Sequence, residues 1–256
     1  MENRRTLLLG MGLALAPLAG LQAQTPAAAP KLAGAKIAGQ PHLVIYHAEG
    51  RRSERIVWLC EELGIAYDLK YHRGDVAASF ADIRKINPGM GTAPTVIYDG
   101  QLLMESGAII QVILDREGKG RLVPAVKSPD YATHHLFMHF AEGTLASDVI
   151  ADYRVARATG GKAPRGAQTD GQRAMRYADD FLGEHPWFGG AQFTAADIMM
   201  LFPTSYAIRM NVADPKNYPR VLAWQAKVEA RPAFKRMLAV ARPDGRVSPP
   251  PSLTVE

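Results

Sequence analysis

The spacing of hydrophobic positions predicts alternating short strands and helices from about residue 42 onwards. Residues 43–46 form an apolar run of strand-favouring side chains. From Ser53 to Leu63 apolar side chains recur every three to four residues and Gly64 follows, which predicts a helix that ends at the glycine. In residues 67–71 apolar and polar positions alternate, as expected for a second, half-buried strand.

The same region continues with a helix, a hairpin and another helix. Residues 80–86 are predicted to form a short helix that Asn87-Pro88 stops. Two strand-like runs, 95–98 and 101–104, flank the hairpin dipeptide Asp99-Gly100. Ser106 begins a last helix, whose inward positions are Ile109, Ile110, Ile113 and Leu114. The order β-α-β-α-β-β-α predicts a compact α/β domain over residues 41–118.

Strand signals stop after this domain. Residues 119–130 are predicted to be a linker, and residues 131–243 an all-helical domain rich in Met, Ala and Leu, with a polar, glycine-containing break at 159–171. Thr194 followed by Asp197 predicts a variant of the capping box at a helix start. Residues 244–256, which contain three consecutive prolines, are predicted to be a disordered tail.

The first residues are predicted to be an export signal rather than part of the fold. Arg4 and Arg5 precede an apolar run over 7–21, and a cleavage point after Ala23 would remove residues 1–23. The arginine pair is similar to the twin-arginine pattern, which carries folded proteins across a bacterial membrane and predicts a periplasmic protein. An ordinary secretory signal and an uncleaved anchor are the alternatives, although the run is short for a span of about 20 residues. Residues 24–40, rich in Ala, Pro and Gly, are predicted to be a flexible spacer.

Composition narrows the function classes. Of 256 residues, 47% are hydrophobic and 21% are charged, an ordinary globular balance. The 30 basic and 25 acidic residues give a net charge of +5 and are interspersed, so a nucleic-acid partner is not expected. The single cysteine, Cys60, excludes a disulfide framework and is predicted to be a buried structural thiol. His135 and His139 are four residues apart on a predicted helix, but without a third ligand no metal site is predicted.

Six segments, in order along the chain, resemble the glutathione transferase family from about Pro41 to Arg242. They are YHAEGRRSERIVWLCEELG, GTAPTV, MESGAI, MHFAEGT, FTAADIMM and ARPAFKRML. The resemblance implies a thioredoxin-like domain with a mixed four-stranded sheet, followed by an all-helical domain. It also implies glutathione as co-substrate, no metal, a homodimer, and conjugation of the glutathione thiol to small apolar electrophiles in detoxification. A protein of the same fold that binds glutathione conjugates or apolar ligands without catalysis is the alternative.

The resemblance assigns glutathione contacts to two places in the α/β domain. It implies a cis peptide bond between Ala93 and Pro94, next to Thr92, which would expose the backbone of Ala93 to the peptide backbone of glutathione. Glu105 and Ser106 lie at a predicted helix start, where an anion is favoured, and would hold the γ-glutamyl group. On spacing alone Ser106 could equally be a helix N-cap.

Catalytic roles rest on the segment between the first strand and the first helix. Aligned on the family pattern, Tyr46 is the first candidate for a hydroxyl that stabilises the thiolate, Ser53 at the helix start is the second, and Arg51 is an electrostatic helper. Tyr46 could instead be a core aromatic, and Arg51 part of a solvated basic face. No cysteine lies in this segment, which disfavours thiol–disulfide chemistry. The electrophile pocket is predicted to involve Phe137, Met138, Phe140 and Tyr206, each of which could also be helix–helix core.

Overall fold

The structure is a computed structural model that describes residues 42–160 and 168–245. The predicted export signal (1–23) and spacer (24–40) lie outside the described residues, as does most of the predicted tail. In the part of the chain that the structure describes, no helix is long and apolar enough to cross a membrane.

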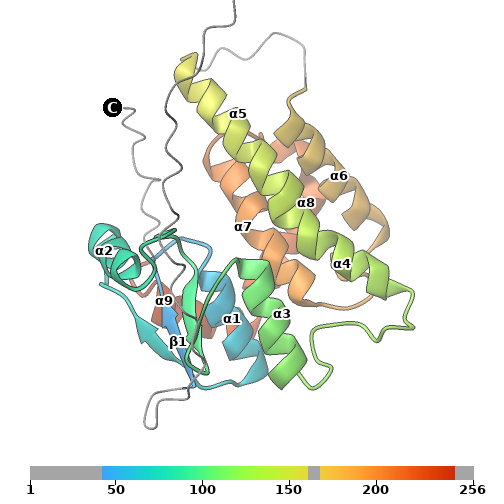
Figure 1. Cartoon of the computed structure of the whole chain (residues 1–256). Coiled ribbons are helices and arrows are strands. Elements are labelled where there is room, and N and C mark those ends of the chain that lie inside the picture. The colour runs from blue at the N-terminus through green and yellow to red at the C-terminus, as the bar shows by residue number, and fades with distance from the viewer. Residues whose placement is uncertain (1–41, 161–167, 246–256) are drawn as a thin grey trace, which may run out of the picture. The chain divides into compact units, whose positions relative to one another are not determined.

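A mixed four-stranded sheet forms the centre of the α/β region (Figure 1). Its strands are β1 (Leu43–Tyr46), β2 (Asp68–Lys70), β3 (Thr95–Tyr98) and β4 (Gln101–Met104), in the order β2-β1-β3-β4. β1 is parallel to β2 and antiparallel to β3, and β3 is antiparallel to β4. The predicted order of elements and the mixed sheet are confirmed.

The hairpin turns at Asp99-Gly100, as the sequence predicts. Both residues have positive φ angles, 50° for Asp99 and 80° for Gly100, and Tyr98 pairs with Gln101 on either side of them. Positive φ at both central residues matches the right-handed twist of the strands, and a glycine adopts it without a steric penalty.

Three helices flank the sheet: α1 (Glu54–Leu63), α2 (Val76–Ile86) and α3 (Ser106–Glu117). α1 ends at Gly64, whose φ of 67° is left-handed. α2 begins earlier than predicted because the Asp75 side chain accepts the Ala78 N–H at 2.9 Å and caps the first turn. Leu43 and Ile45 of β1 share a hydrophobic cluster with α1 and α3. Val44 points to the opposite face of the sheet, on which α2 packs.

The rest of the described chain is helical, apart from its connecting loops. Its elements are α4 (Asp130–Phe140), the π-helix η1 (Ala141–Ala146), α5 (Ser147–Ala158), α6 (Asp170–Glu184), α7 (Ala195–Arg209), the 3₁₀-helix η2 (Pro215–Asn217), α8 (Pro219–Glu229) and α9 (Pro232–Ala241). Figure 1 shows α4 running through η1 into α5 as one continuous rod.

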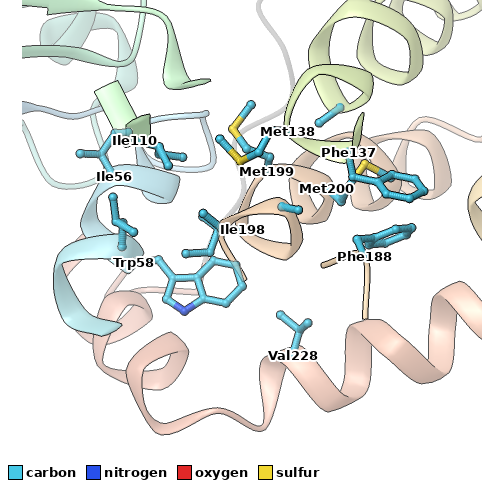
Figure 2. Close-up of a cluster of buried hydrophobic side chains, with 14 of the residues drawn as sticks. Ile56, Trp58, Ile110, Phe137, Met138, Phe188, Ile198, Met199, Met200 and Val228 are labelled. Carbon is cyan, nitrogen blue, oxygen red and sulfur yellow. The ribbon is translucent and has the colours of Figure 1, made fainter. Parts of the chain in front are cut away.

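The core is centred on α7, which begins with the predicted capping box. The Asp197 carboxylate accepts the N–H groups of Thr194 and Phe188 and the indole N–H of Trp224, each at 2.9 Å. The next three side chains, Ile198, Met199 and Met200, are buried among residues of α1, α3, α4 and α8 (Figure 2). Cys60 is buried on α1, and burial raises the pKa of its thiol, so the prediction of a structural thiol is confirmed.

Candidate glutathione site

His47 organises the loop between β1 and α1. It is fully buried, and its Nε2 lies 2.6 Å from the carbonyl oxygen of Ala241 at the end of α9. A carbonyl only accepts, so Nε2 carries the proton. Burial lowers the pKa of His47 to about 4, so the ring is neutral near pH 7 and Nδ1 is an acceptor. The Ser53 hydroxyl, 2.8 Å from Nδ1, is therefore the donor in that bond.

Ser53 consequently has little to offer a bound sulfur. Its side chain is fully buried, its proton is directed to His47, and its oxygen accepts the Ala48 N–H at 3.2 Å. This arrangement braces the loop from within. The catalytic role predicted for Ser53 stays a prediction, and this arrangement disfavours it, because the hydroxyl proton already has an intramolecular acceptor.

Tyr46 is the last residue of β1 and lies opposite Thr95 of β3. Side chains alternate along a strand, so Tyr46 points to the same face as Val44 and away from Ile45, which packs with α1 and α3. Its ring is half-buried on the face that carries α2. The catalytic role predicted for Tyr46 stays a prediction, and this orientation disfavours it.

The second predicted contact region is the loop before β3. The peptide bond between Ala93 and Pro94 is cis, as the resemblance implies. Thr92 is exposed, and its carbonyl accepts the Thr95 hydroxyl at 2.7 Å. Among the described residues no hydrogen bond uses the backbone N–H or C=O of Ala93, which is only partly buried. A peptide ligand can therefore pair with this residue in the manner of an added strand.

Glu105 and Ser106 lie where β4 meets the N-terminus of α3. Glu105 is exposed and has a φ of 69°, a left-handed conformation that is unusual for a non-glycine residue and is often found at functional sites. Ser106 is buried, and its oxygen accepts a hydrogen bond from Nη1 of Arg55 at 3.3 Å. The pair offers a carboxylate, a hydroxyl and unpaired helix N–H groups within one turn.

The sequence analysis did not identify Arg55 as a site residue, although its side chain connects the candidate site to η1 and α7. Its guanidinium is buried and donates to Glu142 Oε1 in η1 at 2.5 Å and to the carbonyl of Met199 in α7. Arg52 donates to both oxygens of Glu142, at 2.8 and 2.9 Å. Burial lowers the pKa of Arg55 to about 10, so it remains a cation near pH 7. The sequence does indicate this inward orientation, because Arg55 lies four residues before Leu59 and therefore on the apolar face of the helix.

A cavity of about 150 Å³ lies between α1, α7 and α9, beside the loop that His47 and Ser53 brace. We call it the arginine cavity. Its apolar walls are Trp58, Ile198, Leu201, Phe202, Phe234 and Met237. Charged side chains also line it: Arg51, Glu54, Arg55, Arg209, Glu229 and Arg242. Gly50 and Arg51 place the start of α1 directly at this cavity.

The aromatic residues predicted for the electrophile pocket do not line this cavity. Phe137 is fully buried, with its ring centroid 4.5 Å from that of Phe181 and 4.8 Å from that of Phe188, the second of which it faces in Figure 2. Met138 is also core, and Phe140 packs on Phe137. The pocket role predicted for these three stays a prediction, and it is disfavoured because they pack inside the helical bundle. Tyr206 stacks on Phe202, which is a wall of the arginine cavity.

Within residues 42–160 and 168–245 no three His, Cys, Asp or Glu side chains converge as metal ligands. His135 packs edge-on against Tyr131, and its neighbour His134 binds the Thr194 hydroxyl at 3.0 Å. The groups that the site does offer, a free backbone edge at Ala93 and a helix N-terminus at Ser106, suit a small charged peptide.

Two family profiles match the chain. Residues 45–121 match the N-terminal domain of glutathione S-transferase, and residues 158–240 match its C-terminal domain. Among solved structures, a glutathione S-transferase from Actinobacillus pleuropneumoniae superposes with a TM-score of 0.68 at 24% identity, covering 78% of this chain and 92% of that one. Ure2p5 from Phanerochaete chrysosporium, crystallised with 1-(S-glutathionyl)-2,4-dinitrobenzene, gives 0.62 at 18% identity, covering 82% and 99%. These likenesses show a shared fold.

Sequence relatives lead to the same family. Glutathione S-transferase 1 of Saccharomyces cerevisiae is 20% identical over 228 residues, covering 79% of this chain and 96% of its own length. Glutathione S-transferase 3 of Schizosaccharomyces pombe is 30% identical over 209 residues, which cover 75% of this chain and 85% of that protein. This chain therefore belongs to the glutathione S-transferase family.

Proposed function

We propose that the protein binds glutathione and transfers its thiol to small electrophiles. The observation that carries this proposal is the free backbone of Ala93 near the helix start that holds Glu105 and Ser106. Ala93 would pair with the backbone of the cysteinyl residue. Ser106 and the N-terminus of α3 would hold the γ-glutamyl carboxylate, while the Glu105 carboxylate would pair with the ammonium group.

The sulfur would then lie near the start of α1. Tyr46 pairs with Thr95, so the end of β1 and the loop that follows it lie beside the Ala93–Pro94 bond. The positive dipole end of α1 and the Arg51 guanidinium both favour a negative sulfur there. The thiol proton leaves to solvent, and the sulfur electron pair attacks the electrophile. We rank Arg51 and the helix start above Tyr46, because Tyr46 points to the other sheet face.

Calorimetry tests the binding half of the proposal. We expect Ser106→Ala and Glu105→Gln each to weaken glutathione binding by about ten- to a hundredfold, since a charge-assisted hydrogen bond contributes about 1.5–3 kcal/mol. Ser147→Ala, an exposed serine of α5, is the matched control and should bind normally. Unchanged affinity in both site variants would place glutathione elsewhere. Turnover on a panel of electrophiles tests the transfer half.

A non-catalytic binder of glutathione conjugates is the second candidate. The hydroxyl of Ser53 is engaged by His47, and Tyr46 turns away, so a bound sulfur has no evident hydroxyl donor. The two candidates differ in the pKa of the bound thiol, which falls in an enzyme and stays near that of free glutathione in a simple binder.

We also propose that the protein is exported to the periplasm of a bacterium by the twin-arginine route. The support is the arginine pair ahead of the short apolar run over residues 7–21. Replacing Arg4 and Arg5 by lysine should leave the precursor in the cytoplasm, and normal export of that variant would exclude this route.

We further propose a homodimer, as the family resemblance implies, and sedimentation of the mature chain at two ionic strengths would measure it.

A further inference from the structure

The arginine cavity has an unusual combination of apolar walls and positive charge. Trp58, Ile198 and Met237 are buried on its inner side, whereas Arg209, also part of its lining, is exposed. On α7 the residues Ile198 and Arg209 are eleven apart, and so lie on the same helix face. A cavity of about 150 Å³ can hold a ring the size of benzene. The shape suits an apolar body with a charged group at its outer end.

The cavity is lined by three arginines besides Arg55, namely Arg51, Arg209 and Arg242. Although Arg209 is exposed as a whole, partial burial lowers the pKa of its guanidinium, the charges of Arg51 and Arg242 lower it further, and Glu54 opposes them. Among the described residues Arg209 forms no ion pair within 4 Å, although Glu54 acts on its charge from further away, and its guanidinium lies 5.5 Å from the centroid of the Tyr206 ring.

The carboxylates of the cavity leave Arg209 without a close ion pair. The Glu54 carboxylate already accepts the Gly50 N–H at 2.8 Å, and its Oε1 lies 3.5 Å from Nε of Arg242. This Nε atom is buried and makes no hydrogen bond among the described residues. Glu229 lies at the end of α8 and is exposed. Arg55 also lines the cavity, but Glu142 offsets its charge. The outer end therefore presents Arg209, which forms no ion pair within 4 Å among the described residues, beside a half-closed apolar space.

We propose that the arginine cavity selects electrophiles that carry a carboxylate on a small apolar body, with the carboxylate bound by Arg209 and Arg242. This inference rests on the proposed function, because the cavity reaches Gly50 and Arg51, where the glutathione sulfur would lie. Guanidinium groups bind carboxylates through paired hydrogen bonds, and a partly dry site strengthens that attraction. The proposed selectivity is for electrophiles that carry a negative charge at one end.

A chloronitrobenzoate is a suitable probe. With 4-chloro-3-nitrobenzoate, the glutathione thiolate forms a carbon–sulfur bond at the ring carbon that bears chlorine. The carbon–chlorine bond then breaks, and chloride leaves with the bonding electron pair. The neutral control is 4-chloro-3-nitrobenzamide, which has nearly the same shape. Each enzymatic kcat/KM is divided by the uncatalysed rate constant of the same compound, so that differences in intrinsic reactivity cancel.

The experiment compares this normalised ratio of benzoate to benzamide in the full-length protein and in variants. We expect a ratio of at least ten in the unmodified protein and a fall of at least fivefold in Arg209→Gln. Arg209→Lys should recover part of it. Arg173→Gln, an exposed arginine of α6, removes the same net charge and should leave the ratio unchanged. A ratio within one protein does not depend on the folded fraction, so a destabilised variant remains informative.

The other outcomes separate this inference from the proposed function. Turnover of neither compound, nor of any other electrophile, would contradict the proposed function itself. Turnover of the benzamide at least as well as the benzoate would overturn the inference and leave the function standing. A weaker affinity for glutathione in Arg209→Gln, with the substrate ratio unchanged, would show that the arginines bind the glycyl carboxylate of glutathione and would also overturn it.

Discussion

His47 decides how the Ser53 hydroxyl is used, because its two ring nitrogens have different partners. One is fixed as a donor by the Ala241 carbonyl, and the other receives the Ser53 proton. The sequence did not single out His47, since a histidine after a strand carries no pattern of its own. The orientation of Tyr46 could have been predicted, because Leu43 and Ile45 alternate into the core and leave Tyr46 on the other face.

We predict that Ser53→Ala destabilises the protein without changing the thiol chemistry. Losing a buried hydrogen bond and leaving Nδ1 of His47 unpaired should lower the free energy of unfolding by about 1–3 kcal/mol. Urea denaturation measures this, with the exposed Ser147→Ala as control. The pH dependence of kcat/KM should be the same as in the unmodified protein. A profile moved to higher pH would instead restore Ser53 as the donor to sulfur.

At the scale of elements, the α/β order and the hairpin followed from hydrophobic spacing and turn chemistry, and the structure confirms both. The π-helix η1 was not predicted, because one inserted residue leaves almost no trace in apolar periodicity. The wide turn carries Glu142, which pairs with Arg52 and Arg55 of α1. Periodicity alone also could not assign Phe137, since a core aromatic and a pocket aromatic have the same spacing.

We predict that Glu142 positions Arg55, and through it Ser106. Glu142→Gln should weaken glutathione binding by about tenfold, as the Arg55 guanidinium loses its carboxylate partner and shifts away from Ser106. In a double-mutant cycle, Ser106→Ala added to Glu142→Gln should cost less than it does alone. Calorimetry measures each step, and Glu184→Gln on α6 is the exposed control. Additive effects would show that the two residues act separately.

At the scale of the whole molecule, two buried histidines make stability depend on pH. Burial lowers the pKa of both His47 and His134 to about 4, from 6.5. Between those values the unfolded chain binds more protons than the folded one, so stability rises with pH. The contribution is complete above about pH 6.5 and is lost as the pH falls towards 4. For one histidine the full shift corresponds to about 3 kcal/mol.

We therefore predict that the melting temperature drops steeply between pH 6.5 and pH 4. His47→Gln should flatten part of this dependence, because an amide offers similar hydrogen bonds without titrating in that range. Scanning calorimetry at half-unit steps is the measurement. His139→Gln, an exposed histidine of α4, should keep the full slope. A His47→Gln slope equal to that of the unmodified protein would mean that His47 is not neutral when folded.

The most direct test of the central claim is an ultraviolet titration of the glutathione thiol bound to the protein. We predict that its pKa lies at least one unit below that of free glutathione, since the start of α1 and the Arg51 guanidinium both stabilise the thiolate. Arg51→Gln should raise this pKa, and Tyr46→Phe should leave it nearly unchanged. A bound thiol that titrates like free glutathione in the unmodified protein would contradict activation at this site and leave a non-catalytic binder.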